Sequence, residues 1–115
     1  MKVLIIDDDS MILRMAGFIL KKGGHEAVAA GSGEEGISLA GESAFDMVFV
    51  DVEMPGMNGF ETLEKLKAGP CGDIRVCMMS GTVTDEVRQK ASQLGAVGVI
   101  GKPLDAAEVL GIING

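Results

Sequence analysis

The architecture of the chain follows from the segment Met47-Val48-Phe49-Val50-Asp51, four apolar residues followed by a carboxylate. Three other runs have the same form: Val3-Leu4-Ile5-Ile6 before Asp7-Asp8, Val76-Cys77-Met78-Met79 before Ser80, and Val97-Gly98-Val99-Ile100 two residues before Lys102. Short apolar runs that lead into polar residues are typical of buried parallel strands. Ligands of an open α/β sheet bind at the carboxyl ends of its strands. We therefore expect the acidic groups, the hydroxyl and the lysine to meet in one pocket.

A weaker strand-like segment at 26–30 completes a set of five strands, and the fourth strand is expected over about 74–79. A helix-like segment follows each strand. The first, 11–22, repeats apolar residues at spacings of three and four, as one buried helix face requires. The other four are expected from 33 to about 41, from about 60 to a point before Gly69, between Thr84 and Gly95, and shortly after Asp105.

Small polar residues stand where helix N-termini need hydrogen-bond acceptors, and we expect caps at Ser10, Ser32, Thr84 and Asp105. Ser32 and Glu35 have the spacing of a capping box. Asp9 is expected to be a solvated residue of the first helical turn. The alternating order predicts a parallel sheet with right-handed crossovers and helices on both faces. The 115 residues are expected to form one domain.

Composition excludes several classes of function. A net charge of −7 argues against direct binding of nucleic acid, which needs clustered lysine and arginine. The apolar runs are too short for a signal peptide or a membrane span, so we expect no membrane contact and a cytoplasmic location. The two cysteines, Cys71 and Cys77, do not have a zinc-binding spacing. We expect Cys77 to be buried and Cys71 to be an exposed thiol in a loop.

The predicted pocket suits a divalent cation and a phosphoryl group. Two carboxylates about 4 Å apart repel by about 4 kcal/mol at an effective dielectric constant of about 20, so clustering Asp7, Asp8 and Asp51 requires a compensating cation. Mg²⁺ prefers oxygen ligands and is the natural candidate. Lys102 and Ser80 could contact phosphoryl oxygens. Asp51, alone at its strand end, could act as a nucleophile toward phosphorus.

Each of these residues also has an ordinary structural interpretation. Aspartates at strand ends often belong to turns or helix N-termini, a serine after a strand is commonly a turn residue, and Lys102-Pro103 is a common loop dipeptide. No single residue therefore identifies the function. The joint arrangement at four predicted strand ends does indicate it, because all four would lie at the same edge of one sheet.

Four motifs resemble the receiver domain of two-component response regulators, and the resemblance covers essentially the whole chain. The motifs are Val-Leu-Ile-Ile-Asp7-Asp8-Asp9-Ser10, Val50-Asp51-Val52-Glu53-Met54-Pro55-Gly56-Met57-Asn58-Gly59, Met79-Ser80-Gly81 and Gly101-Lys102-Pro103-Leu104. The second motif is the most specific. The resemblance implies a flavodoxin-like fold of five strands in the order 2-1-3-4-5.

The resemblance also implies roles for residues. Asp51 matches the phosphoacceptor, and Asp7, Asp8, Asp51 and the backbone carbonyl of Glu53 match the Mg²⁺ site. Ser80 matches the switch hydroxyl, Lys102 the lysine that contacts the phosphoryl group, and Pro103 a proline preceded by a cis bond. The implied donor is a phosphohistidine of a sensor histidine kinase or phosphotransfer protein. An output domain or partner protein would then respond through the face formed by the fourth helix, fifth strand and fifth helix.

One departure concerns the switch. The family usually has Tyr or Phe three residues before the lysine, where this chain has Val99, and the chain contains no Tyr. The usual aromatic rotation cannot accompany movement of Ser80. Acceptor chemistry is unaffected, but output must be transmitted in another way.

Two alternative functions remain. A pseudo-receiver would be an interaction module that accepts no phosphate, and failure of phosphorylation by small donors would favour it. An aspartate-nucleophile phosphatase of the haloacid-dehalogenase type also uses a strand-end aspartate and Mg²⁺. That family has a second aspartate where this chain has Glu53, and 115 residues leave little room for a cap over a substrate. The receiver interpretation is that of a regulatory domain rather than an enzyme.

Overall fold

The structure is a computed structural model that describes residues 1–69 and 72–115. Five strands alternate with five helices in this part of the chain. In chain order the elements are β1 (Lys2–Ile6), α1 (Ser10–Lys22), β2 (Glu26–Ala30), α2 (Gly33–Glu42), β3 (Met47–Asp51), α3 (Gly59–Ala68), β4 (Arg75–Ser80), α4 (Asp85–Gln93), β5 (Gly98–Gly101) and α5 (Ala106–Asn114).

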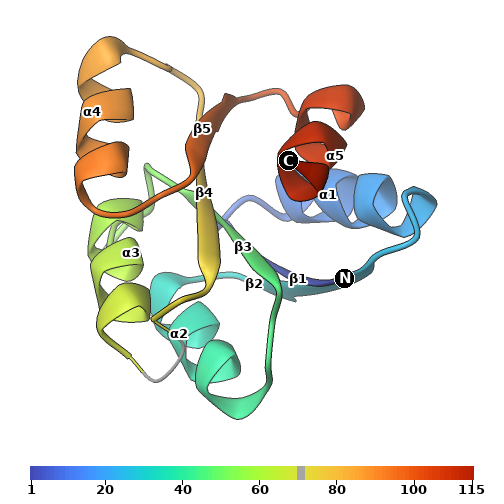
Figure 1. The fold of residues 1–115 in the computed structure, drawn as a ribbon, viewed down its shortest axis with the longest axis horizontal. Coiled ribbons are helices and arrows are strands. Elements are labelled where there is room, and N and C mark those ends of the chain that lie inside the picture. Colours follow the sequence, from blue (N-terminus) through green and yellow to red (C-terminus); the bar gives the residue numbers. More distant parts are fainter. Residues whose placement is uncertain (70–71) are drawn as a thin grey trace.

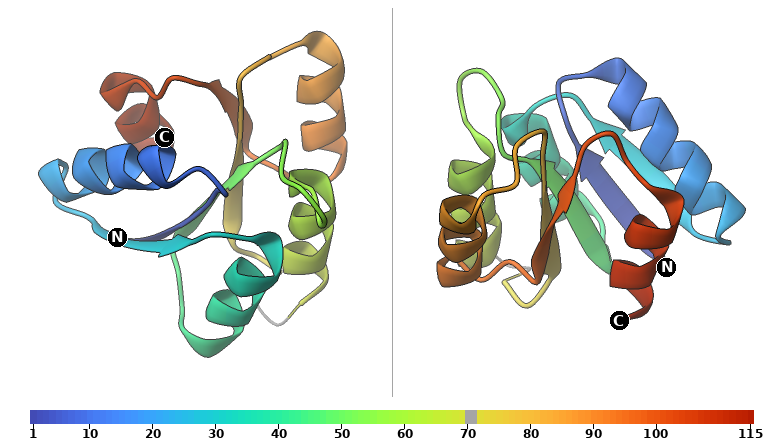
Figure 2. Two further views of the ribbon diagram at one scale, coloured as in Figure 1. Left: turned by 180° about the vertical axis from the view of Figure 1, so that it is seen from behind. Right: turned by 90° about the horizontal axis from the view of Figure 1, so that it is seen from above.

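The strands form one parallel sheet in the order β2-β1-β3-β4-β5, which confirms the predicted fold. Figures 1 and 2 show α1 and α5 on one face of the sheet and α2, α3 and α4 on the other. Both faces are therefore covered, as the uninterrupted apolar runs predicted.

Side chains of the strands alternate between two cores. Leu4, Val48 and Val76 belong to a cluster with residues of α2, α3 and α4. Val3, Phe49 and Cys77 belong to the cluster under α1 and α5. The predicted burial of Cys77 is confirmed, and burial raises the pKa of its thiol to about 12. Cys71, predicted to be an exposed thiol, lies outside the described residues.

The strand register brings the carboxyl ends of the central strands level with one another. Asp51 of β3 is paired with Met79 of β4, one residue before Ser80, and Ser80 is paired with Gly101 of β5. Asp51 and Ser80 are thus the last residues of their strands rather than the first residues after them. The pairing places both, together with Lys102, at one edge of the sheet.

The helix caps confirm three predictions and correct one. Ser32, Thr84 and Asp105 each accept a hydrogen bond from a backbone N–H in the first turn of their helices. The N-cap of α1 is Asp9, not Ser10, and Ser10 is the first helical residue. Asp9 has an extended backbone and accepts a hydrogen bond from Met11 N at 2.9 Å, so it is not merely solvated. A carboxylate caps well here because the helix N-terminus is electropositive.

Smaller differences concern the ends of elements. Glu35 accepts a hydrogen bond from Gly31 N rather than from Ser32 N, so the predicted capping box of α2 is only half formed. The complete capping box lies at α3, between Asn58 and Glu61. β5 begins at Gly98, and Val97, which was predicted to start it, is 47% exposed. In the described part of the chain, no helix has the length and apolar character needed to cross a membrane.

Candidate functional site

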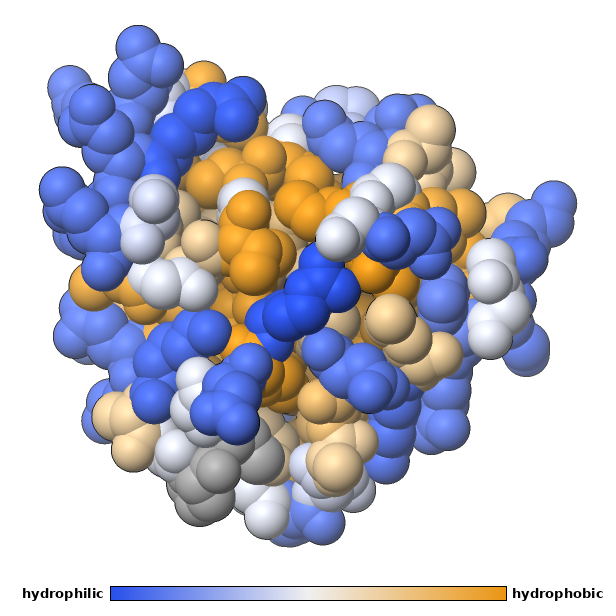
Figure 3. Space-filling view, in the orientation of Figure 1, coloured by the Kyte–Doolittle hydropathy of each residue, from blue (hydrophilic) through white to orange (hydrophobic). Residues whose placement is uncertain are grey.

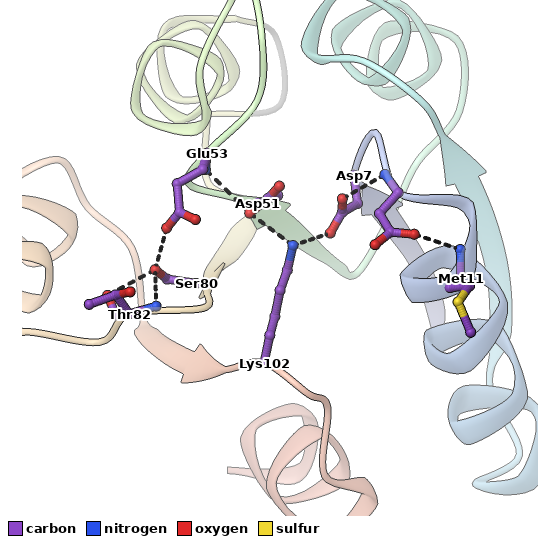
Figure 4. A network of polar contacts seen from close by, with 8 residues as sticks. Asp7, Met11, Asp51, Glu53, Ser80, Thr82 and Lys102 are labelled. Carbon is purple, nitrogen blue, oxygen red and sulfur yellow. Dashed lines mark hydrogen bonds and ion pairs between the residues drawn. The ribbon is translucent and has the colours of Figure 1, made fainter.

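The ends of β1, β3, β4 and β5 bring four of the predicted site residues together, as Figure 4 shows. Asp7 follows β1 and has no exposed surface, while Asp51 ends β3 and is 2% exposed. Ser80 ends β4 and is also fully buried. Lys102 follows β5 and extends its side chain between the two aspartates. Isolated polar groups would be costly at such burial, so their pairing decides whether the site is stable.

Lys102 connects the two buried carboxylates. Its Nζ lies 2.7 Å from Asp7 Oδ2 and 3.1 Å from Asp51 Oδ1. Lys102 N donates a hydrogen bond to Ser80 O at 2.9 Å, which holds the start of the lysine segment against β4. The bond between Lys102 and Pro103 is cis, the isomer that the resemblance implied.

Burial and charge shift the pKa values of both partners. Burial lowers the pKa of Lys102, but hydrogen bonds and charge attraction from Asp7 and Asp51 outweigh burial, so its pKa is raised and the ammonium form is favoured. The pKa of Asp51 is raised from 3.8 to about 6, chiefly by burial. The neighbouring charge of Asp7 raises it further, and the bond to Lys102 opposes both. Burial therefore favours the protonated form of Asp51 more than water does.

The two oxygens of Asp51 differ in their contacts. Oδ1 forms the ion pair with Lys102 and accepts a hydrogen bond from Glu53 N at 3.2 Å. In the described residues we find no hydrogen bond or ion pair to Oδ2. One oxygen thus orients the carboxylate, and the other remains available for a metal ion or for bond formation with an electrophile.

Asp7, Asp8 and Asp51 fit a divalent cation. Carboxylate oxygens from all three lie within 4.8 Å of one another. Asp7 is anchored by Asp9 N, which donates to its Oδ1 at 2.9 Å, whereas Asp8 is exposed at the mouth of the site. Three carboxylates near one ammonium leave an excess of negative charge that a dication would balance. A mixture of buried and exposed carboxylates suits Mg²⁺, which keeps several water ligands.

Ser80 lies beside this cluster, and its hydroxyl faces Glu53. Ser80 Oγ is 2.6 Å from Glu53 Oε1 and 2.9 Å from Thr82 O, and Thr82 N donates to Ser80 Oγ at 3.1 Å. Sequence reasoning assigned Glu53 a role only through its backbone carbonyl. Its side-chain contact was missed, because no sequence spacing links residues 27 positions apart.

Gly59 is a second residue that sequence reasoning did not single out. It begins α3, and its N donates to Val52 O at 3.1 Å. A Cβ atom at this position would collide with the carbonyl oxygen of Asp51. Glycine therefore allows the start of α3 to approach the end of β3, which fixes the loop that carries Glu53. Gly-rich turn composition predicted a loop here, but not this close approach.

Val99 takes the place on β5 where the family usually has an aromatic residue. It is paired with Met78 of β4 and packs, partly buried, against the cluster beneath α2, α3 and α4. A β-branched side chain has few rotamers in this setting. The site therefore contains a buried hydroxyl at the end of β4 without a neighbouring aromatic side chain on β5.

The chain is similar to several characterised proteins. Sporulation initiation phosphotransferase F of Bacillus subtilis is 30% identical over 108 residues, which are 94% of this chain and 86% of that protein. Sensory/regulatory protein RpfC of Xanthomonas campestris is 32% identical over 113 residues, which are 96% of this chain but only 16% of that protein. The solved structure of chemotaxis protein CheY4 of Vibrio cholerae has a TM-score of 0.91 and 29% identity, covering 98% of this chain and 95% of that one.

The model of the response regulator receiver domain family matches residues 3–114, nearly the whole length of the chain. The sheet order, the acidic cluster and the lysine and hydroxyl at neighbouring strand ends are the arrangement that the resemblance implied. The chain therefore belongs to the response regulator receiver domain family of two-component systems.

Proposed function

We propose that residues 1–115 form a single receiver domain that works as a phosphorylation-controlled switch, with Asp51 as the phosphoacceptor. The observation that carries this proposal is the asymmetric setting of Asp51. Lys102 and the N–H of Glu53 hold Oδ1, while Oδ2 is left available at the carboxyl edge of the sheet. A buried, oriented carboxylate with one available oxygen is a suitable nucleophile toward phosphorus.

In the proposed reaction, an oxygen of Asp51 attacks the phosphorus of a phosphohistidine. The new P–O bond forms as the P–N bond breaks, and the imidazole leaves with the electron pair. Lys102 would contact an oxygen of the transferred group, and Ser80 would turn to donate a hydrogen bond to another. Asp7, Asp8, Asp51 and the backbone carbonyl of Glu53 would hold Mg²⁺, which when bound neutralises charge on the transferring oxygens. The domain regulates a partner and turns over no other substrate.

Two surfaces support partners of this kind. Met11, Met15 and Phe18 lie at spacings of four and three along α1 and are 69%, 39% and 65% exposed. Their helix begins three residues after Asp7, so this apolar stripe starts beside the acceptor site and suits the helices of a histidine kinase or phosphotransfer protein. The domain would then act in the cytoplasm, where such kinases use ATP.

The second surface is the face formed by α4, β5 and α5, where we place the output domain or partner protein. Figure 3 shows apolar surface between α4 and α5, over β5. Val97, at the entrance to β5, is 47% exposed. The proposed regions are separate, because α1 adjoins the acceptor site and Val97 lies before β5, at the opposite end of that strand from Lys102.

The acceptor is tested with acetyl phosphate and Mg²⁺. Intact-protein mass spectrometry should show one added phosphoryl group on the wild-type chain and none on Asp51→Asn. Equal labelling of Asp51→Asn would refute the acceptor assignment. Absence of labelling of a folded, Mg²⁺-saturated wild-type chain would favour a pseudo-receiver.

The donor surface has its own test. Phe18→Ser should slow transfer from a phosphohistidine-containing protein that phosphorylates the wild type, without changing the acetyl phosphate rate. Val97→Ser removes a similarly exposed apolar side chain from the other face and serves as the matched control. If both variants receive phosphate from the protein donor at the wild-type rate, α1 is not the donor surface.

A further inference from the structure

The hydrogen bond between Ser80 and Glu53 is unlike the other contacts of the site, because it turns the Ser80 hydroxyl away from Lys102 and Asp51. Ser80 Oγ has two potential acceptors, Glu53 Oε1 at 2.6 Å and Thr82 O at 2.9 Å. A hydroxyl has only one proton to donate. Bonds to a carboxylate are shorter and stronger than bonds to a neutral carbonyl, so the proton is directed to Glu53.

We propose that the Glu53 carboxylate is a latch that holds the Ser80 hydroxyl in its unphosphorylated position, so that a phosphoryl group on Asp51 must displace Glu53 before Ser80 can turn toward it. This inference rests on the proposed function and concerns how the same site is regulated. Figure 4 shows that the Ser80 hydroxyl contacts Glu53 and Thr82, on the side of Ser80 away from Lys102.

Burial explains why the latch has two defined positions. Ser80 has no exposed surface, so its hydroxyl needs a hydrogen-bond partner both before and after the switch. Glu53 is exposed and can be rehydrated once it is released. Glu53 and the phosphoryl oxygens therefore compete for the Ser80 hydroxyl proton. Release of Glu53 costs little free energy, because water can solvate its carboxylate.

Repulsion between the phosphoryl group and the Glu53 carboxylate would also favour release of Ser80. A phosphoryl group adds about 1.5 to 2 negative charges and three strong acceptor oxygens, and it would be attached to Asp51, two residues before Glu53. Like charges at such separations repel. Phosphorylation would thus offer Ser80 a better acceptor and also push Glu53 away. Because Val99 replaces the usual aromatic residue, this competition would set the balance between inactive and active forms.

Beryllofluoride, a phosphoryl mimic, measures the strength of the latch. Without the Glu53 acceptor, less free energy is needed to turn Ser80 toward the ligand. Glu53→Ala should therefore bind beryllofluoride about tenfold more tightly than wild type in saturating Mg²⁺. Glu53→Gln keeps a neutral acceptor and should give a smaller gain. Glu64→Ala removes an exposed glutamate from α3 and should leave the affinity unchanged.

A double-mutant cycle separates the latch from simple repulsion between Glu53 and the anionic ligand. In the Ser80→Ala background there is no hydroxyl to hold and only charge repulsion remains, so adding Glu53→Ala should raise the affinity clearly less than it does in the wild-type background. An equal gain in both backgrounds would mean that Glu53 acts only through its charge, and would overturn the latch. An unchanged affinity of Glu53→Ala itself would overturn it as well.

A measurement without ligand keeps this inference separable from the proposed function. Thr82 N donates to Ser80 Oγ at 3.1 Å, so the Thr82 amide signal in NMR spectra reports the state of the hydroxyl. It should shift in Glu53→Ala and not in Glu64→Ala. If it does not move in Glu53→Ala, the latch is absent. If it does move but the wild type takes neither beryllofluoride nor a phosphoryl group, the proposed function fails and the Glu53–Ser80 contact stands alone.

Discussion

The ammonium group of Lys102 lies 2.7 Å from Oδ2 of Asp7, a carboxylate with no exposed surface. Oδ2 accepts no other contact in the described residues, so this cation is what balances the buried charge. Removing one partner of a buried pair leaves an uncompensated charge, which costs far more than the pair itself contributes.

Lys102→Met should therefore lower the free energy of unfolding by about 3 kcal/mol in the absence of Mg²⁺, the low end of the usual cost because Lys102 is partly exposed. Saturating Mg²⁺ should restore most of the loss, because the ion would bind the same carboxylates. Urea denaturation with and without Mg²⁺ measures both effects. Lys65→Met removes an exposed lysine from α3 and should change little in either condition. If Mg²⁺ did not restore the free energy of unfolding lost in Lys102→Met, the prediction that the ion and the lysine balance the same carboxylates would be wrong.

The raised pKa of Asp51 predicts a pH-dependent stability. Because its pKa is about 6 in the folded chain and 3.8 as a model value, the native state holds the proton more strongly. The free energy of unfolding should then fall as pH rises from about 4 to about 6 and stay low above that window. Asp51→Asn mimics the protonated form. It should be more stable than wild type by about 2–3 kcal/mol at pH 8 and equally stable below about pH 4.

Denaturation of both proteins across this pH range, without metal, is the measurement. Asp73→Asn changes an exposed aspartate and should follow the wild-type curve. Mg²⁺ should reduce the difference in free energy of unfolding between Asp51→Asn and wild type at pH 8, because it stabilises the ionised carboxylate that the variant lacks. If Asp51→Asn were less stable than wild type at pH 8 without metal, the attraction of Lys102 would stabilise the Asp51 charge more than burial destabilises it, which is the reverse of what we propose.

Metal binding should depend on Asp8 but not on the side chain of Glu53. Asp8 is exposed and lies in the group of three carboxylates, whereas Glu53 is proposed to use its backbone oxygen. Asp8→Ala should abolish Mg²⁺ binding in calorimetric titrations without destabilising the metal-free chain. Glu53→Gln should bind nearly as wild type. Equal loss in the two variants would show that the Glu53 carboxylate is itself a ligand.

The activated state should be transmitted through the loop after β4 and through α4. Ser80 is hydrogen-bonded to Thr82, which leads into α4, whereas Val99 is small and stiff. Amide and methyl NMR with and without beryllofluoride should show large changes over residues 81–88 and small ones at Val99. The free energy that couples activation at Asp51 to the change in this loop and α4 is expected to be modest, about 1–3 kcal/mol. A rotamer change at Val99 comparable to the response of the loop would contradict this route.

Sequence alone determined the features that depend on neighbouring residues. Apolar runs such as 47–50 predicted buried strands, and the caps at Ser32, Thr84 and Asp105 were predicted because each uses a hydrogen bond to a residue three positions away. The polar residues at the strand ends also predicted the site, since parallel strands bring their carboxyl ends to one edge. The order of the strands came from the family resemblance, because apolar periodicity does not specify which strands pair.

Tertiary structure decided which groups meet across the chain. Asp9 and Ser10 are both good caps, and the path from β1 into α1 selects Asp9. The register of β3 with β4 brings Ser80 within 2.6 Å of Glu53, a contact that no local pattern announces. Periodicity and capping act over three or four residues, whereas side-chain partners and pKa values depend on distances through space. Only the folded sheet therefore sets the pairing of Lys102 with two aspartates and of Ser80 with Glu53.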